Sequence, residues 1–406
     1  MRIYKIFLSL VLIASLLSAV AFPSAAKTVS SECDVSDVAV PIAVPDSQPP
    51  FGAALDIGAR SAVLLEPSTL EILYESNPDE KLPPASITKI MSLVLIMEAI
   101  DRGDLKIDDV ISASAHAASM GGSQIWLKEN ESMTVDDLLK ATVIASANDA
   151  TVALAEAVAG SEEGFVGLMN EKARALGMNG TVFKNATGLD AEGHLSTAHD
   201  VALMSAELLK HPLIKDYSTV WMDSLRDGQS ELVNTNKLVR FYKGTTGLKT
   251  GTTSDAGYCL AASAERDGME LVAVIMGGES SAARFEGAKK LLDYGFANYS
   301  FQKIAPEFRN GTRIAVKGGE EPDVPLAAGE GIGILLKKSE RANVTQNVNL
   351  PASVKAPVRE GDKAGEIEIF AGDTLIGVID ITAQESVKKM SFGRALLRLL
   401  KGLLSA

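Results

Sequence analysis

A serine and a lysine three residues apart, Ser86 and Lys89, are a pair whose types and spacing suggest chemistry. On a helix, side chains three positions apart lie on one face, so the two groups are expected to meet. A serine hydroxyl is a weak nucleophile until a neighbouring base takes its proton. Lysine serves as that base only when burial or a second cation lowers its pKa. The apolar neighbours Ile87, Ile90 and Met91 favour burial. The pair therefore predicts nucleophilic catalysis, with a plain helix N-cap as the alternative role of Ser86.

Two further motifs supply groups that such a nucleophile needs. The sequence serine-alanine-asparagine at residues 146–148 interrupts a helical pattern, which places polar side chains in a cleft; a plain interhelical loop is the alternative. The sequence lysine-threonine-glycine at residues 249–251 stands just before a predicted strand. Its lysine would lower the pKa of Lys89 and attract a carboxylate. Its glycine would let a substrate backbone approach the strand edge. A solvated lysine in a hairpin turn is the alternative.

The glycines around Lys249 do not form a phosphate-binding loop. That loop requires glycine, four residues, and then Gly-Lys-Ser/Thr. Here Leu248 precedes the lysine, and residue 243 is not glycine. The spacing therefore excludes a nucleotide site at this segment.

The elements that position these motifs are expected to form an α/β (α+β) domain over residues 51–300. Short apolar runs on either side of residues 66–69, and again on either side of Asp267-Gly268, predict two hairpins. The segment from Ser86 onward predicts a largely buried helix, and residues 134–160 predict two helical pieces. Residues 280–299 return to helical spacing. We therefore expect an antiparallel sheet at the centre and a helical subdomain in the middle of the domain.

Residues 301–384 predict a small all-β domain. Apolar and polar residues alternate there between glycine turns, most clearly in a hairpin around Ala371-Gly372-Asp373. No constellation of catalytic residue types is found in it, so a packing or spacer module is favoured over a ligand site.

The last residues, 385–406, predict a basic amphipathic helix. At 100° per residue the apolar and the basic side chains separate. The apolar face holds Phe392, Leu396, Leu399, Leu400 and Leu403, and the basic face holds Arg394, Arg398 and Lys401. The segment is too short and too charged to span a bilayer. We expect residues 387–404 to lie on the membrane surface, with a helix docked on its own protein as the alternative.

The N-terminus predicts export. Arg2 and Lys5 precede an apolar run at residues 6–22, and the small residues Ser24 and Ala26 stand where a signal peptidase cuts. Residues 1–26 are therefore predicted to be a signal peptide, and residues 27–50 an extended lead-in. An uncleaved membrane anchor is the alternative, and it too places the protein outside the cytoplasm.

Composition narrows the class of protein. The chain has 406 residues, 46% of them hydrophobic and 22% charged, as in ordinary globular proteins. A net charge of −13 argues against nucleic-acid binding. Two cysteines, Cys33 and Cys259, cannot build a disulfide framework, and we expect no bridge between them. Nothing in the sequence indicates an obligate dimer, so a monomer is expected.

The three motifs in this order resemble the serine, second serine and lysine motifs of penicillin-recognising enzymes. The chain is similar to the low-molecular-weight penicillin-binding proteins, specifically the serine-type D-alanyl-D-alanine carboxypeptidases. The likeness extends over residues 50–385 and the tail, and it includes the flanking segments 188–204, 234–239 and 283–296. It implies a β-lactamase-like transpeptidase fold and an enzyme that removes the terminal D-alanine from peptidoglycan stem pentapeptides. It also implies inhibition by β-lactams and a location at the outer face of the cytoplasmic membrane.

The resemblance assigns a role to each motif residue. Ser86 would be acylated by the penultimate D-alanine, Lys89 would be its base, and Ser146 would relay a proton to the leaving amine. Asn148 would bind the peptide amide and orient Lys89. The terminal carboxylate would meet Lys249 and Thr250, with Arg284 close behind. The backbone N–H groups of Ser86 and Thr252 would form the oxyanion hole. Water would then hydrolyse the acyl-enzyme, and no metal or organic cofactor is needed.

Two positions depart from the family pattern. Ala147 stands where relatives carry glycine or aspartate, and Thr187 stands where they often carry histidine. The second departure is expected to affect substrate preference or deacylation rate. Neither implies loss of activity.

Three alternatives remain at the level of sequence. A class A β-lactamase of the same superfamily would carry an aspartate in the second motif and a glutamate in an E-x-x-L-N segment, and neither is found. A non-catalytic protein that binds peptidoglycan stems would not need the motifs intact. A zinc peptidase would need spacings such as H-E-x-x-H. The four histidines, His116, His194, His199 and His211, do not provide them.

Overall fold

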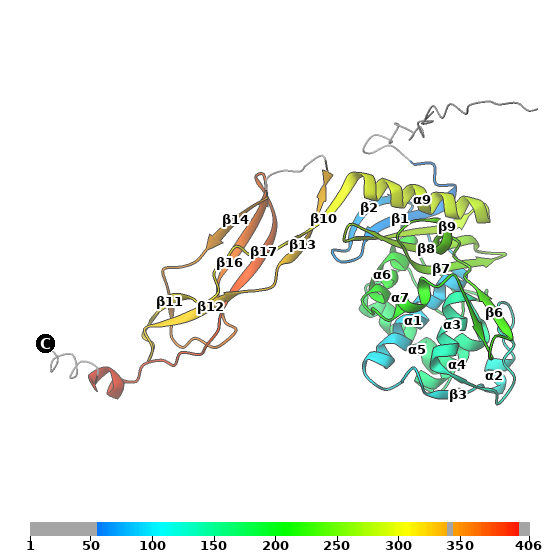
Figure 1. The fold of residues 1–406 in the computed structure, drawn as a ribbon, viewed down its shortest axis with the longest axis horizontal. Coiled ribbons are helices and arrows are strands. Elements are labelled where there is room, and N and C mark those ends of the chain that lie inside the picture. Colours follow the sequence, from blue (N-terminus) through cyan, green and yellow to red (C-terminus); the bar gives the residue numbers. More distant parts are fainter. Residues whose placement is uncertain (1–54, 339–343, 398–406) are drawn as a thin grey trace, which may run out of the picture. The chain divides into compact units, whose positions relative to one another are not determined.

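The computed structural model describes residues 55–338 and 344–397, which leaves the predicted signal peptide, the lead-in and the last part of the tail outside the described residues. A five-stranded antiparallel sheet lies at the centre of the first domain, with strand order β2-β1-β9-β8-β7 (Figure 1). Its strands are β1 Ala59–Glu66, β2 Glu71–Ser76, β7 Thr245–Thr253, β8 Gly257–Arg266 and β9 Met269–Gly278. Both predicted hairpins, β1–β2 and β8–β9, are confirmed. The second turns at Asp267 and Gly268, both with positive φ, as a two-residue hairpin requires.

The sheet is covered on both faces because its central strands alternate between two cores. In β9, Val272, Val274 and Met276 belong to the core shared with the helical subdomain. Their neighbours Leu271 and Ala273 belong to a second core. That second core includes apolar residues of α9 Ser281–Asn298, the helix predicted over residues 280–299. The sandwich of helix, sheet and helices confirms the predicted fold class.

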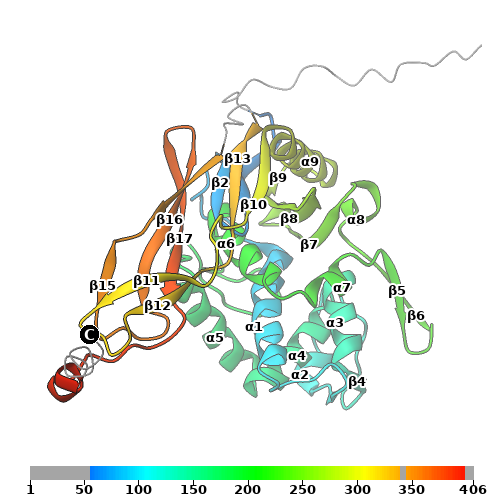
Figure 2. The same ribbon diagram turned by 60° about the vertical axis from the view of Figure 1, so that its left-hand side comes forward.

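The helical subdomain is built around α1 Lys89–Asp101 (Figure 2). Most of α1 is buried, which suits a helix that is apolar on nearly every side. The helix predicted from Ser86 is confirmed, except that its first turn is the 3-10 segment η1 Ala85–Thr88. The predicted break near residues 146–148 is also confirmed, since it separates α3 Val135–Ile144 from α4 Asn148–Ala159.

The domain contains five further helices and two small hairpins among the described residues, and α6 packs against both α1 and the sheet. The helices are α2 Ala115–Ala118, α5 Glu162–Ala175, α6 Ala198–Leu209, α7 Ile214–Ser218 and α8 Leu238–Phe241. The strands form two small hairpins, β3 Val110–Ser112 with β4 Ser132–Thr134, and β5 Met222–Leu225 with β6 Ser230–Val233.

The position of the lysine motif differs from the prediction. Residues 249–251 lie inside β7, not before a strand. Glycine is depleted in strands, and its repetition here favoured a loop, but β7 is the sheet's edge strand and pairs with β8 on one side only. The other edge of the strand is therefore open beside the motif.

The second domain is all-β, as predicted, with a core of its own. A pair, β10–β13, accompanies a six-stranded sheet of order β14-β16-β17-β12-β11-β15. The strands are β10 Tyr299–Ile304, β11 Thr312–Lys317, β12 Asp323–Ala328, β13 Ile332–Lys337, β14 Val344–Asn349, β15 Ser353–Lys355, β16 Lys363–Ala371 and β17 Thr374–Ala383. The hairpin predicted around residues 371–373 is confirmed as β16–β17.

The tail helix begins later than predicted. Val387 and Lys389 form β-bridges with Val358 and Gly319, so residues 387–390 are extended. Val387 is buried in the core of the second domain, which explains why the helix cannot start at 385. Helical conformation is described for residues 392–397. The boundary predicted at 300/301 likewise falls inside β10.

Candidate active site

The serine and the lysine of the first motif meet as predicted. Lys89 Nζ lies 3.1 Å from Ser86 Oγ. Ser86 is on the 3-10 turn, and Lys89 is the first residue of α1 that follows it. The lysine side chain is fully buried, which removes its amine from bulk solvent.

Lys89 Nζ contacts two acceptor oxygens besides the serine hydroxyl. Nζ lies 2.6 Å from Asn148 Oδ1 and 2.7 Å from the carbonyl oxygen of Thr187. Both oxygens only accept, and in the structure Nζ also donates to Ser86 Oγ, so a protonated amine satisfies all three contacts. Once it loses a proton, the amine can keep its N–H groups on Asn148 and Thr187 and turn its lone pair to the Ser86 hydroxyl. That second arrangement is the one that a general base requires.

The surroundings of Lys89 lower its pKa and so favour the neutral amine. Burial is the largest cause that holds the pKa of Lys89 well below its ordinary value, and the nearby charge of Lys249 lowers it further. The carboxylate of Asp149 opposes them. Lys249 therefore has the depressing effect predicted from the sequence. Its own pKa is lowered to about 7, mainly by burial and next by the charge of Arg284.

Asn148 is fixed by the loop that precedes it in sequence. Its Nδ2 donates to the carbonyl oxygen of Gly121 over 2.7 Å, so Oδ1 must face Lys89. Its backbone N–H donates to the carbonyl oxygen of Ser123 over 2.7 Å. Ser146 has a positive φ of 65° and is buried at the same break. Among the residues that the structure describes, its hydroxyl has no hydrogen-bond partner, so the structure does not join Ser146 to Lys89.

The third motif lines the open edge of β7. Lys249 is buried, and its Nζ lies 3.3 Å from the carbonyl oxygen of Thr250. Thr250 Oγ1 donates to Thr235 Oγ1 over 2.7 Å. Arg284 Nη1 donates to the carbonyl oxygen of Gly251 and to Thr252 Oγ1, both over 2.9 Å. Arg284 thus holds the strand next to Lys249 and Thr250, where we expected it to lie.

Gly251 has a different structural role from the predicted one. A Cβ on this residue would lie 2.9 Å from Ser86 N and 3.0 Å from the carbonyl oxygen of Pro84. The missing side chain therefore lets the turn that carries Ser86 approach β7, whereas we expected it to admit a substrate backbone. The close approach sets the backbone of Ser86 beside the strand that carries Thr252.

The structure also reveals a glycine that the sequence did not single out. A Cβ on Gly188 would lie 1.8 Å from the carbonyl oxygen of Ala85, and this glycine has a φ of +86°. The preceding residue is Thr187, whose carbonyl oxygen contacts Lys89. Thr187 therefore contributes its backbone at this point, which lessens the weight of the side-chain departure noted above. No pattern of residue types signals a backbone acceptor.

His194 contacts the last residue of η1, the turn that carries Ser86. The backbone N–H of Lys184 donates to Nδ1 over 3.3 Å, so Nε2 carries the proton and donates to Thr88 Oγ1 at 2.9 Å. Burial is the main cause that lowers the pKa of His194 to about 4. The ring is thus neutral in the folded protein and holds the residue next to Lys89.

We expect His194 to limit stability in acid. The folded pKa of about 4 lies below the ordinary value of 6.5, so the unfolded chain binds the extra proton first. Stability that is present above pH 6.5 is therefore lost as the pH falls towards 4, by up to about 3 kcal/mol. In His194→Gln this part of the loss should disappear. Urea unfolding at several pH values measures it, with His199→Gln as the control; equal slopes in the parent and His194→Gln would contradict the assignment.

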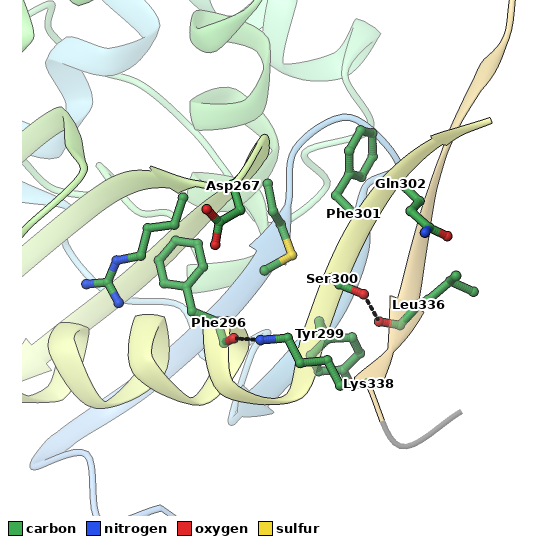
Figure 3. Close-up of a pocket in the computed structure, with 10 residues that line it drawn as sticks. Asp267, Phe296, Tyr299, Ser300, Phe301, Gln302, Leu336 and Lys338 are labelled. Carbon is green, nitrogen blue, oxygen red and sulfur yellow. Dashed lines mark hydrogen bonds between the residues drawn. The ribbon is translucent and has the colours of Figure 1, made fainter. Parts of the chain in front are cut away.

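A pocket elsewhere in the chain contains none of the predicted site residues. It has a volume of about 760 Å³ and is lined by residues of the β8–β9 turn, the end of α9, and β10 and β13 (Figure 3). Its Lys338 Nζ donates to the carbonyl oxygen of Phe296 over 2.7 Å. Arg266 lies over the rings of Tyr242 and Phe296. Within residues 55–338 and 344–397, no group of three or more metal-ligating side chains is found.

Two family models match the chain. The model described as D-alanyl-D-alanine carboxypeptidase matches residues 46–280. The model described as penicillin-binding protein 5, C-terminal domain, matches residues 304–389. The two matches correspond to the two domains of the described structure.

Similar curated proteins carry related names. The chain is 43% identical to D-alanyl-D-alanine carboxypeptidase DacF of Bacillus subtilis, over 82% of this chain and 87% of that protein. It is 33% identical to D-alanyl-D-alanine carboxypeptidase DacC of Escherichia coli, over 84% and 86%.

Two solved structures of penicillin-binding proteins are similar to this chain. Penicillin-binding protein 5 of Haemophilus influenzae has a TM-score of 0.73 at 28% identity, and the match covers 83% of this chain and 99% of that one. Penicillin-binding protein D2 of Listeria monocytogenes, in its ampicillin-bound form, has a TM-score of 0.55 at 32% identity, over 60% and 100%.

Proposed function

Because the chain belongs to the family of D-alanyl-D-alanine carboxypeptidases, serine hydrolases that act on peptidoglycan peptides, we propose that Ser86 is the residue acylated and Lys89 its base. The observation that carries the proposal is the buried amine of Lys89, which lies 3.1 Å from Ser86 Oγ and makes its other two contacts with acceptor oxygens. The comparisons support the carboxypeptidase and give no support to the β-lactamase or the non-catalytic protein.

The proposed reaction begins at the contact between Lys89 and Ser86, and the proton relay through Ser146 is the role that the family resemblance assigns to it. Lys89 Nζ takes the hydroxyl proton as Ser86 Oγ forms a bond to the carbonyl carbon of the penultimate D-alanine. The backbone N–H groups of Ser86 and Thr252 stabilise the oxyanion. The C–N bond then breaks, and the proton returns through Ser146 to the departing amine. A water molecule, with its proton taken by Lys89, hydrolyses the ester and frees Ser86. A β-lactam acylates the same serine through its cyclic amide.

Substrate recognition uses the open edge of β7. Asn148 binds a peptide amide of the stem, and the terminal carboxylate meets Lys249 and Thr250. Arg284 holds β7 in place by its bonds to Gly251 and Thr252 and adds positive charge behind the strand. These contacts need neither a metal nor an organic cofactor.

We expect the enzyme to prefer a free carboxylate through Lys249. A stem peptide ending in a carboxamide should show kcat/KM lower by roughly tenfold to a hundredfold, since one charged hydrogen bond is lost. In Lys249→Gln the acid and the amide should react alike. Because the pKa of Lys249 is about 7, the preference should also fall as the pH rises through 7. D-alanine or D-alaninamide release measures both rates, and a preference retained in Lys249→Gln would contradict the assignment.

Export and membrane attachment complete the proposal. We assign residues 1–26 to a signal peptide, 51–298 to the catalytic domain, 299–390 to the β domain and 391–406 to the tail, with the protein a monomer at the outer face of the cytoplasmic membrane. The described part of the tail exposes Phe392, Leu396 and Leu397 to solvent. Arg394 forms an ion pair with Glu320, which ties the start of the helix to its own protein. Within the described residues, no helix is long and apolar enough to cross a bilayer.

Deletion of residues 392–406 should release the protein from membranes. Binding to vesicles that contain anionic lipid is expected to weaken at least tenfold, since each basic residue near such a surface contributes about 1 kcal/mol. Cosedimentation with vesicles measures the change, and D-alanine release by the truncated enzyme confirms that it is folded. Unchanged cosedimentation would contradict membrane attachment through the tail.

A further inference from the structure

Trp126 is an exposed aromatic side chain on the loop that holds Asn148. Its exposed fraction is 74%, which is unusual for a residue type that is highly buried on average. Its backbone has a φ of +55°, a left-handed conformation that a bulky aromatic residue rarely adopts. The same loop supplies the carbonyl oxygens of Gly121 and Ser123 to Asn148. Trp126 therefore lies three residues along the chain from Ser123, whose carbonyl oxygen accepts from Asn148.

A buried carboxylate maintains this conformation. The backbone N–H groups of Ile125 and Leu127, on either side of Trp126, both donate to Asp149, over 3.1 Å and 3.0 Å to Oδ2. Asp149 follows Asn148 directly and is fully buried. Arg226 Nη1 donates to the carbonyl oxygen of Ile125 over 3.0 Å. Backbone strain of this kind persists only where surrounding contacts enforce it, and it concentrates at functional sites.

Trp126 borders a groove with polar walls. The groove has a volume of about 630 Å³ and lies between this loop and the turn of the β5–β6 hairpin. Apart from Ile125, its other lining residues are polar or charged: Lys128, Glu129, Asn130, Glu131, Arg226, Gln229 and Ser230. An indole face offers a flat apolar surface, and the amide and ammonium groups offer donors and acceptors around it. A sugar ring with an N-acetyl group needs this combination, because its C–H face is apolar and its rim carries hydroxyl and amide groups.

We propose that Trp126 and this groove form a subsite for an N-acetylated sugar of the glycan strand that carries the stem peptide. The inference rests on the proposed function, since it extends the substrate beyond the stem. Four extended peptide residues span up to about 14 Å. The stem can therefore hold the sugar well away from the bond that is cleaved, so the glycan would contact residues outside the immediate site of Ser86.

The test compares two substrates that differ only in the sugar. One is a disaccharide-linked stem pentapeptide, and the other is the same pentapeptide with an acetylated N-terminus. In the full-length parent enzyme, kcat/KM for the glycan-linked substrate should exceed that of the peptide by roughly threefold to tenfold. Trp126→Ala should bring the ratio to about one while leaving kcat/KM of the free peptide unchanged. Trp126→Phe should restore part of the ratio, and Leu375→Ala, an exposed apolar residue of the β domain, should not alter it.

Each other outcome overturns the inference in a recognisable way. Equal loss on both substrates would mean that Trp126 binds the peptide or supports the loop structurally. No loss on either would mean that nothing binds there. A second variant, Trp126→Gly, should raise the melting temperature by relieving the positive φ while it abolishes the sugar preference; a lower melting temperature would contradict stored strain. If the parent released D-alanine from neither substrate, the proposed function itself would fail.

Discussion

Replacing Lys89 with methionine should reduce D-alanine release and penicillin acylation at least about a thousandfold, because the base is removed. Methionine has nearly the same length and fills the buried site. It leaves the oxygens of Asn148 and Thr187 without their partner, a cost of about 1–3 kcal/mol for each buried acceptor. The variant no longer has to bury a polar amine, and this gain in folding free energy offsets part of that cost, so the variant should remain folded. Rates with a stem peptide and with a fluorescent penicillin measure the loss.

The control is Lys89→Arg. Arginine keeps a cation in the site but retains its proton at any accessible pH. It should therefore be as inactive as methionine. If Lys89→Arg kept more than a tenth of the parent rate, Lys89 would act through its charge and not as a base.

Gly188→Ala is expected to have the second-largest effect. The new Cβ would lie 1.8 Å from the carbonyl oxygen of Ala85, so the turn that carries Ser86 must move. A displacement of about 1 Å in a reacting group costs about a hundredfold in rate. Acylation by a fluorescent penicillin should fall by at least that factor. The free energy of unfolding should drop by about 2–3 kcal/mol, from the clash and the positive φ together.

Gly193→Ala separates the clash from the backbone strain. Gly193 has a similar φ of +74°, but its nearest neighbour is Lys184 Cε at 3.5 Å. This variant should lose only about 1 kcal/mol of stability and keep its acylation rate. Equal rate losses in the two variants would show that the approach to Ala85 is not what matters.

The motifs at residues 86–89 and 146–148 were predictable because they depend only on residue types and on their spacing along the chain. Ser86 and Lys89 share a helical face, and the polar interruption at residues 146–148 marks the break between two helices. The two hairpins of the sheet were predictable from their turn residues. In each case a local rule and the final fold agree.

Other features depend on contacts that local rules do not describe. β7 carries a glycine at position 251 because the turn that holds Ser86 packs against it, a requirement set by residues far away in sequence. β12 contains Pro325, which argues against a strand between two others, yet it pairs with β11 and β17. The tail helix starts at Phe392 because the β domain buries Val387. Periodicity alone could not place that start.

Supporting contacts in the site were the hardest to foresee. The carbonyl oxygen of Thr187 that holds Lys89 belongs to the backbone, so no residue type signals it. His194 reaches Thr88 across 106 positions of the chain. Asp149 is next to a predicted residue, but its partners lie on a separate loop. Such groups become visible only when the chain is folded.

D-alanine release from a stem peptide ending in D-Ala-D-Ala, measured for the enzyme without residues 1–26 and for its Ser86→Ala variant, tests the central claim most directly. We expect release by the parent and none by the variant, with an adduct of penicillin on Ser86 in the parent alone. Release by Ser86→Ala at a rate near that of the parent would contradict the assignment of the nucleophile. No release and no adduct in the parent would contradict the whole account.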